Sequence, residues 1–442
     1  VLLFTMAVCL LTGMLFGLVP ALRSLRVEVN PTLKNSAAPE SRPRFAWGKG
    51  LVAGQVALSL VVLFGANLLV RSLQNLMTQQ FGFNANSIVV AHVNAIAAGY
   101  SGIKSGELAQ QLTARLSAVP GVRAISYSRH GLLSGSETSN PIVVPGFTPA
   151  NPDDRSVRED SVGPNYFDVV GTPILLGRGI GPQDTAITTR VAVVNEAMVK
   201  YFFHGENPIG RQFEIDSPEE MDKPFTIIGV SKNAKDHPGR NGALLREAVP
   251  PRFFFAYQQD PRPPRLIFEI STIGDPNALL SAVRSQIKAA APNLSINSIY
   301  TVRQELEQSL GSQIGLAKLS GLFAALGLLL ACIGLYGIMS YTVAGRTREI
   351  GVRIALGAQR RDVLQLALTE GMLLAAVGLA VGIPMSLASG RLLNSFLFGL
   401  KSTDPTSLIG MVLLLAVIAA VAGLVPARRA TKVDPLVALR YE

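Results

Sequence analysis

The stretch LSGLFAALGLLLACIGLYGIMSYTVAG, residues 319–345, runs for 27 residues without an Asp, Glu, Lys or Arg. An uncharged apolar run of about 20 residues is long enough to cross the hydrocarbon of a bilayer as a helix. Four further stretches of the chain are also free of charge, at residues 1–22, 51–70, 371–390 and 405–427. The sequence therefore predicts an α-helical membrane protein and excludes a simple soluble one.

The surplus of positive charge indicates how these helices are oriented. The 442-residue chain has a formal net charge of +10. Most of the surplus lies beside the apolar runs, in residues 23–50, 346–370 and 428–442, whereas residues 71–318 are close to neutral. Basic segments that flank membrane helices are typical of the cytoplasmic side. The pattern places residues 71–318 outside the cytoplasm, and it argues against nucleic-acid binding, which needs a basic face on a folded domain.

The segment outside the membrane is predicted to be an α/β domain, because hydrophobic runs of strand length alternate with amphipathic helical segments. Two β-α-β units are expected, one near each end of the segment. The expected elements are strand 87–94, helix 106–119 and strand 122–128, then strand 266–271, a helix from Asp275-Pro276 to about Ala290 and strand 294–300. Between them, residues 142–257 have short strands such as 191–195 and 225–230 among Pro- and Gly-rich loops, which indicates an inserted β-rich subdomain.

Residues 303–318, which follow the second unit, have no helix breaker except Gly311 and Gly315. We expect them to continue the next membrane helix outward as a stalk.

An internal repeat bears on the N-terminal run. The sequence Gly-Leu-Val-Pro-Ala at residues 17–21 recurs at 423–427, each copy ends an apolar run, and basic residues follow each copy. The repeat predicts that residues 1–22 are the last membrane helix of a preceding permease-like unit. The alternative is two unrelated helices that share a membrane-exit motif.

Catalytic and metal-binding patterns are not found in the sequence. The four histidines have no Cys, His or carboxylate at metal-ligand spacing. The nearest approach to a phosphate-binding loop, at residues 47–50, lacks the first glycine and the final Ser or Thr of that motif. We therefore expect a chain that is not an enzyme and that holds no cofactor or metal of its own.

The most informative polar segment is RTREIGVRIALGAQRRDV, residues 346–363, directly after an apolar run. Glu349 and Arg353 stand four residues apart in the order that favours a helical ion pair. A short amphipathic helix of this kind can simply lie on lipid headgroups. The other interpretation is a docking element for a cytoplasmic partner.

Three motifs resemble FtsX-like, MacB-type ABC transporter permeases. The segment 346–363 is similar to their cytoplasmic loop, residues 426–440 to their C-terminal pattern of Pro-Ala-Arg-Arg-Ala followed by Asp-Pro, and residues 165–210 to the MacB-type periplasmic core domain. The resemblance implies a cytoplasmic loop that couples the permease to an ATPase. The residues carried over to it are Arg346, Glu349, Ile350, Gly351, Arg353, Gly357, Ala358, Arg360 and Arg361.

The chain departs from the MacB pattern at its start, where MacB-type exporters carry a fused ATPase domain. The preceding helix expected at residues 1–22 makes the chain similar to a fragment of the duplicated permeases of acidobacteria, with the ATPase on a separate polypeptide.

The predicted architecture is a helical permease unit with a large periplasmic domain, in the bacterial inner membrane. Its expected segments are the preceding helix 1–22, a cytoplasmic linker 23–50, a membrane helix 51–70, a periplasmic core 71–316 and a permease domain 317–442 with helices 317–345, 364–390 and 405–427.

The expected function, by the resemblance, is to pass the effect of ATP hydrolysis by a separate ATPase to the periplasmic domain, most simply for export or efflux. Expected partners are the membrane, that ATPase, a periplasmic or outer-membrane protein, and a second permease unit in a dimeric arrangement. Two alternatives remain: an envelope signalling transducer of the FtsX type, and a membrane-anchored binding protein without an ATPase.

Overall fold

The computed structural model describes Met6 and residues 43–430, except residues 101–102, 150, 219, 221–222, 240–242, 244, 262–264 and 346–358. All but one residue of the preceding helix expected at 1–22 therefore lies outside the described residues. The C-terminal segment from residue 431 lies outside them as well.

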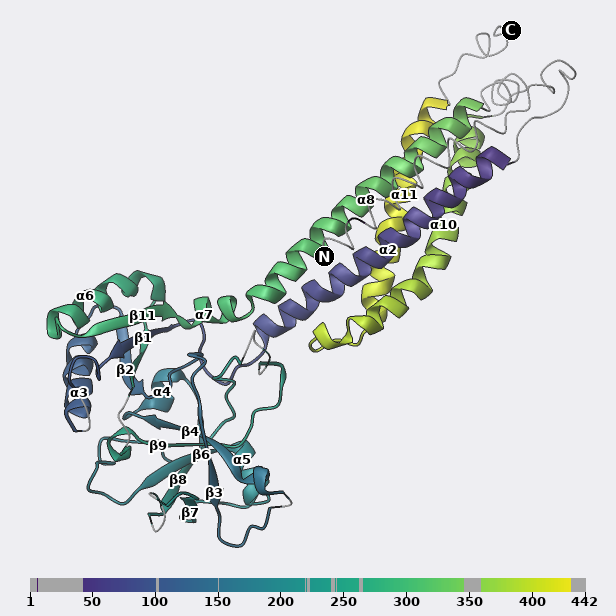
Figure 1. Ribbon diagram of the computed structural model, residues 1–442. Coiled ribbons are helices and arrows are strands. Elements are labelled where there is room, and N and C mark those ends of the chain that lie inside the picture. The colour runs from purple at the N-terminus through teal and green to yellow at the C-terminus, as the bar shows by residue number, and fades with distance from the viewer. Residues whose placement is uncertain are drawn as a thin grey trace, which may run out of the picture.

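A bundle of four long helices forms one end of the molecule (Figure 1). Each contains a segment that is long and apolar enough to cross a membrane, which confirms the four complete membrane helices expected from the sequence. Half of the apolar span of the first helix is buried, against at most 28% of the other spans, so this helix is the centre of the bundle. The helices are α2 (Pro43–Thr78), α8 (Gly311–Gly345), α10 (Arg360–Leu392) and α11 (Pro405–Ala430).

Glycines of α10 allow its backbone to touch that of α2. A Cβ atom at Gly378 would lie 2.7 Å from the carbonyl oxygen of Ala53, and one at Gly382 would lie 3.0 Å from the Cα of Ala57. Small residues at such positions let membrane helices approach closely and gain packing energy. The contact fixes α10 against the central helix.

A four-stranded antiparallel sheet forms the first part of the α/β domain, in the order β11-β1-β10-β2. Both expected β-α-β units are present, and their strands interleave. Strand β1 of the first unit lies between β10 and β11 of the second, and β10 lies between β1 and β2. Helices α3 and α6 cover one face of this sheet (Figure 1). The elements are β1 (Ile88–Asn94), α3 (Ile103–Ser117), β2 (Val122–Ser128), β10 (Leu266–Thr272), α6 (Leu280–Ala290) and β11 (Ser295–Thr301).

Asp275 caps the start of the second helical segment, as expected. Its side chain accepts a hydrogen bond from the backbone N–H of Asn277, and the first turn, Pro276–Leu279, is a 3₁₀ helix that leads into α6.

The inserted strands form a closed ring of six, in which each strand pairs with the next: β4-β3-β7-β8-β6-β9 and back to β4. Aromatic side chains fill its interior, and Phe213, Phe225, Phe253 and Phe255 are almost fully buried there. The strands are β3 (Thr138–Val143), β4 (Ser156–Val162), β6 (Val191–Asn195), β7 (Gln212–Ile215), β8 (Phe225–Ser231) and β9 (Arg252–Ala256), with β5 (Ile174–Gly177) pairing on the outside of β8 and the helices α4 (Tyr166–Val170) and α5 (Glu196–Phe202). The insert is therefore β-rich, with a phenylalanine core of its own.

Strand β4 joins the ring to the four-stranded sheet, because Val162 at its end pairs with Ser128 at the end of β2. We call this contact between the two parts of the α/β domain the seam.

The expected stalk at residues 303–318 is interrupted. A short helix α7 (Val302–Ser309) follows β11, and α8 begins only at Gly311. Leu306 and Leu310 are buried in the core of the α/β domain, which holds α7 against the sheet and ends the helix before α8 starts. The expectation of one continuous helix is wrong at Leu310.

Candidate functional site: the joint between the bundle and the α/β domain

Helix α2 runs from the bundle directly into the core of the α/β domain. Its 36 residues correspond to about 54 Å of helix, well beyond the roughly 30 Å of bilayer hydrocarbon. Leu76, in its last turn, is 1% exposed and packs in a hydrophobic cluster that we call the joint core. The joint core includes Leu76, Phe81, Ile88, Val90, Phe167, Phe254, Leu306 and Leu310, with the half-buried Phe398 packed against it.

The loop between α10 and α11, residues 393–404, is hydrogen-bonded to the outer end of α2. The hydroxyl of Ser72 accepts from the backbone N–H of Phe398 at 2.8 Å and donates to the carbonyl of Phe396 at 3.3 Å. The side-chain amide of Asn75 donates to the carbonyls of Phe398 and Gly399, both at 3.4 Å. Polar groups at the end of a membrane helix thus hold a loop more than 320 residues away in sequence.

An ion pair fixes the start of α11 to the same turn of α2. Arg71 lies 2.7 Å from the carboxylate of Asp404 and also donates to the hydroxyl of Ser407 at 2.8 Å. Asp404 caps α11 by accepting the backbone N–H of Ser407 at 2.9 Å. Hydrogen bonds from Ser407 and the charge of Arg71 hold the pKa of Asp404 below its usual value.

A segment of the insert, residues 232–246, completes the joint. The ammonium of Lys235 donates to the carbonyl of Leu245 at 2.6 Å and to the side chain of Gln79 at 3.0 Å, and it lies 5.3 Å from the ring centre of Phe398. Arg246 donates to the carbonyl of Ser395 at 3.3 Å. The α10–α11 loop is therefore held by α2 on one side and by the α/β domain on the other.

The joint was not identified from the sequence. Its polar residues belong to three separate regions, and none of them has a motif. The sequence offers one weak indication of the ion pair between Arg71 and Asp404. Arg71 is the first charged residue after the apolar run 51–70, and Asp404 is the last one before the run 405–427.

The described residues that flank the expected coupling loop, Gly345 of α8 and Arg360 of α10, lie at the opposite end of the bundle from the joint (Figure 1). Seven of the loop's residues, Arg346, Glu349, Ile350, Gly351, Arg353, Gly357 and Ala358, are outside the described residues. Arg360 is the first residue of α10, and Arg361 after it is exposed. The described helices α8 and α10 flank the loop, and an ion pair between Lys49 of α2 and Glu370 of α10 lies towards the same end. The role of the loop stays a prediction.

Buried ionisable groups lie along the seam and connect it to the joint. Asp160 of β4 is 3% exposed and accepts the backbone N–H of His130 at 3.1 Å. Arg252 of β9 is ion-paired with Asp236, next to Lys235 in the joint, and with Glu137 at 3.2 Å. Burial raises the pKa of Asp160 to about 7, although the charge of Arg252 opposes the shift.

This raised pKa predicts a pH-dependent stability. Because the folded protein keeps the Asp160 proton up to about pH 7 while the unfolded chain loses it near pH 4, stability should fall as pH rises through that window. The shift corresponds to something on the order of 4 kcal/mol. The Asp160→Asn variant cannot ionise, so its melting temperature should fall less than that of the parent between pH 5 and pH 8. Asp168→Asn, at an exposed carboxyl, is the control and should melt like the parent. Equal pH profiles for the parent and Asp160→Asn would contradict the assignment.

Among the described residues, no group of three or more His, Cys, Asp or Glu could hold a metal ion. The joint consists of packing contacts, hydrogen bonds and an ion pair that fix α2 and the α10–α11 loop to the α/β domain.

Two family models match the sequence. The model of the MacB-like periplasmic core domain matches residues 51–290, more than half of the chain, and the model of the FtsX-like permease C-terminal region matches residues 321–435. The chain belongs to the MacB-type, FtsX-like permease family. It is therefore a multi-pass membrane component of the ABC transporter class in the bacterial inner membrane, and its α/β domain is periplasmic.

The chain is similar to part of two relatives with curated descriptions. It is 26% identical over 413 residues to the macrolide export ATP-binding/permease protein MacB of Mannheimia succiniciproducens, with 89% of this chain and 58% of that protein covered. It is 30% identical over 306 residues to the protein of that name from Psychrobacter arcticus, with 64% of this chain and 43% of that protein covered. The chain spans about half the length of these relatives.

A solved structure is also similar. The crystal structure of the periplasmic region of MacB from Actinobacillus actinomycetemcomitans aligns with 53% of this chain and 97% of that chain, at 16% identity and a TM-score of 0.35.

Proposed function

We propose that this permease transmits the effect of ATP hydrolysis by a separate cytoplasmic ABC ATPase to its periplasmic domain, and that the resulting movement serves export. The observation that carries the proposal is α2, one helix with its first half in the bundle and Leu76 in the core of the periplasmic domain. A displacement of α2 at the cytoplasmic side therefore has a direct route to that core.

The interior of the bundle supports transmission by packed helices over conduction through a pore. Its buried centre contains an apolar cluster of Val52, Val56, Leu335, Ala375 and Ala419, and the buried polar side chains described beside it, such as Ser59, Thr342 and Ser386, are small hydroxyls without charge. Pathways for polar solutes across a membrane are lined by polar or charged groups. A packed apolar centre instead moves helices as connected bodies.

Export is proposed because both relatives named above are described as macrolide export proteins. The substrate of this chain is left open by that comparison. The second permease unit of a dimer would complete the membrane part, and the apolar groove of about 720 Å³ between α2 and α8 is the face we assign to it.

The contact with the ATPase is assigned to the loop of residues 346–361 on the cytoplasmic side. Glycines such as Gly351 would permit close approach of a partner surface, and the pair Glu349 and Arg353 would stabilise a short helix there. Arg360 and Arg361 supply positive charge for acidic side chains.

The test is the ATPase activity of the partner that copurifies with the tagged permease from native membranes. We expect Gly351→Leu to reduce the permease-dependent part of this activity by about tenfold, equivalent to roughly 1.4 kcal/mol of contact energy. Gly337→Leu is the matched control, because a side chain there meets open space on the outside of α8. Full permease-dependent activity in Gly351→Leu would instead favour a loop that only lies on lipid. Failure of any ATPase to copurify would favour a membrane-anchored binding protein.

A further inference from the structure

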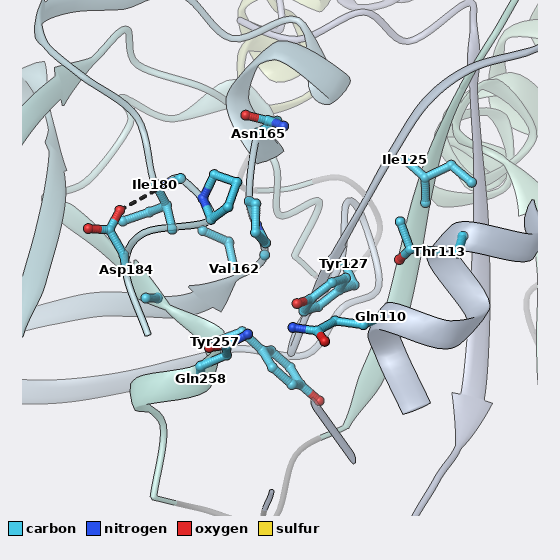
Figure 2. A pocket seen from close by; sticks show the side chains of 16 residues that line it. Gln110, Thr113, Ile125, Tyr127, Val162, Asn165, Ile180, Asp184, Tyr257 and Gln258 are labelled. Atoms are coloured by element: carbon cyan, nitrogen blue, oxygen red, sulfur yellow. Dashed lines mark hydrogen bonds between the residues drawn. The ribbon is translucent and has the colours of Figure 1, made fainter. Parts of the chain in front are cut away.

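A cavity of about 300 Å³ lies between the two parts of the periplasmic domain (Figure 2). Helix α3 and strand β2 form one wall, with Gln110 and Thr113 on the helix. The opposite wall comes from the insert, where Ile180 and Asp184 lie across the cavity from α3 in Figure 2. The volume is at the lower end of the range of small-molecule sites, which often form between domains.

The interior of the cavity is apolar and its edge is polar. Buried Ile125, Val162, Ile180 and Ala256 line its interior. Gln110, Asn165 and Gln258 add carboxamide side chains at its edge. Ligand sites typically combine such an apolar body with a few polar groups that fix orientation.

The lining of the cavity offers a ligand no charge that is free of a protein partner. Asp184 is the carboxylate of the lining, and it is already held by Arg178 through two hydrogen bonds of 2.7 and 2.8 Å and by the backbone N–H of Gly181 at 2.9 Å. The hydroxyl of Tyr257 donates to the carbonyl of Arg265 at 3.2 Å. A charged ligand would lose its hydration here without gaining an opposite charge.

The lining contains two buried hydroxyls, and that of Thr113 forms no hydrogen bond to a described residue. The Tyr127 hydroxyl has only the side chain of Gln258 as a partner, and burial raises the pKa of that hydroxyl to about 12. A buried hydroxyl without a partner costs free energy that a bound donor or acceptor would recover. Both hydroxyls line this one cavity.

We propose that the cavity binds an uncharged small molecule with a one- or two-ring apolar body and hydroxyl or carbonyl groups that pair with Thr113 and Tyr127. The apolar interior takes the ring, and the two hydroxyls and the edge amides orient its polar groups. The binding requires no ATPase, so its failure would leave the proposed coupling function unaffected, and the reverse also holds.

The experiment uses the full chain in lipid nanodiscs, with Cys9 and Cys332 replaced by alanine and a single new cysteine from Ala114→Cys. Ala114 lines the cavity and is exposed, so its thiol can be modified by methyl methanethiosulfonate, in which the thiolate forms a disulfide and releases methanesulfinate. The rate is measured with 4-acetamidophenol, which is neutral, and with 4-hydroxybenzoate and tyramine, which are of similar size and carry opposite charges. Gln111→Cys, exposed on the same helix outside the cavity lining, is the control.

We expect 4-acetamidophenol to slow modification of Ala114→Cys by about threefold at a concentration near twice its dissociation constant, with no effect on Gln111→Cys. The two charged probes should give no protection. When Thr113→Val and Tyr127→Phe are combined with Ala114→Cys, 4-acetamidophenol should no longer slow the modification. The rate without any probe should stay the same. No protection, equal protection by all three probes, or protection that survives loss of both hydroxyls would overturn the proposal. Should the double variant not fold, Thr113→Val alone is expected to weaken protection by 4-acetamidophenol. Unchanged protection in that variant would also overturn the proposal.

Discussion

Gly378→Leu should prevent the four membrane helices from assembling. The Cβ atom alone would lie 2.7 Å from the carbonyl oxygen of Ala53 and 2.8 Å from the Cβ of Val56, so α10 would have to move away from the central helix. Overpacking of this kind costs about 3 kcal/mol when backbone cannot yield, and the close α2–α10 contact leaves no flexible side chain to give way. We expect aggregation or a large loss of thermal stability, measured by fluorescence-detected size exclusion after heating.

Gly410→Leu is the matched control for this variant. Gly410 lies on α11, and a side chain added there meets open space. Its protein should behave like the parent. If Gly378→Leu melted within a degree or two of Gly410→Leu, α10 would not pack against α2 as described.

Phe398→Ala should weaken the connection between the α10–α11 loop and the periplasmic domain while leaving the bundle and the domain folded. The Phe398 ring packs against the joint core and lies beside Lys235, whereas its backbone is held by Ser72 and Asn75 of α2. Truncation removes the contact of the ring with the joint core and keeps the hydrogen bonds of the loop to α2 and to Arg246. Because the ring is only half buried, the loss of stability should be about 2 kcal/mol, below the usual range for a fully buried phenylalanine.

The measurement for Phe398→Ala is the ATP-dependent change in distance between a spin label at the exposed Lys200 and the membrane surface. We expect this change to become smaller, because only α2 still connects the bundle to the joint core, while the ATPase activity of the partner stays within about twofold of the parent. Leu392→Ala is the control, since Leu392 ends α10 directly before the same loop and its side chain is exposed. A smaller change in both variants, or in neither, would contradict a specific role for the Phe398 ring.

The membrane helices and the strands of the four-stranded sheet could be predicted from local sequence. A membrane helix forms its backbone hydrogen bonds within itself, and these strands are short hydrophobic runs bounded by turns or helices. Residues 122–128 are a strand with the predicted bounds, and Asp275-Pro276 opens a helical segment as predicted. The helices α2 and α8 are longer than the predicted ones, because both extend beyond their charge-free runs to the joint. The tertiary contacts of Leu76 and Leu310 with the joint core determine where α2 ends and where α8 begins.

Strand β4 shows why the insert was harder to predict. Its sequence, SVREDSV, contains three consecutive charged residues, a pattern typical of an exposed loop. Glu159 and Asp160 are nevertheless buried, and the charges of Arg129, directly after β2, and of Arg252 in β9 lie close to them. The joint was missed for the same reason, since Ser72, Asn75 and Asp404 acquire their partners only through the tertiary fold.

Nucleotide bound at the cytoplasmic side should move the periplasmic domain. This movement is tested most directly by relaxation of a spin label at Lys200 in nanodiscs that contain gadolinium-chelating lipid headgroups, with the permease and its copurified ATPase. Replacing ADP with a slowly hydrolysed ATP analogue should change the relaxation rate, and the change should disappear in Gly351→Leu and when the ATPase is omitted. An identical relaxation rate with either nucleotide, in a preparation that hydrolyses ATP, would contradict the account.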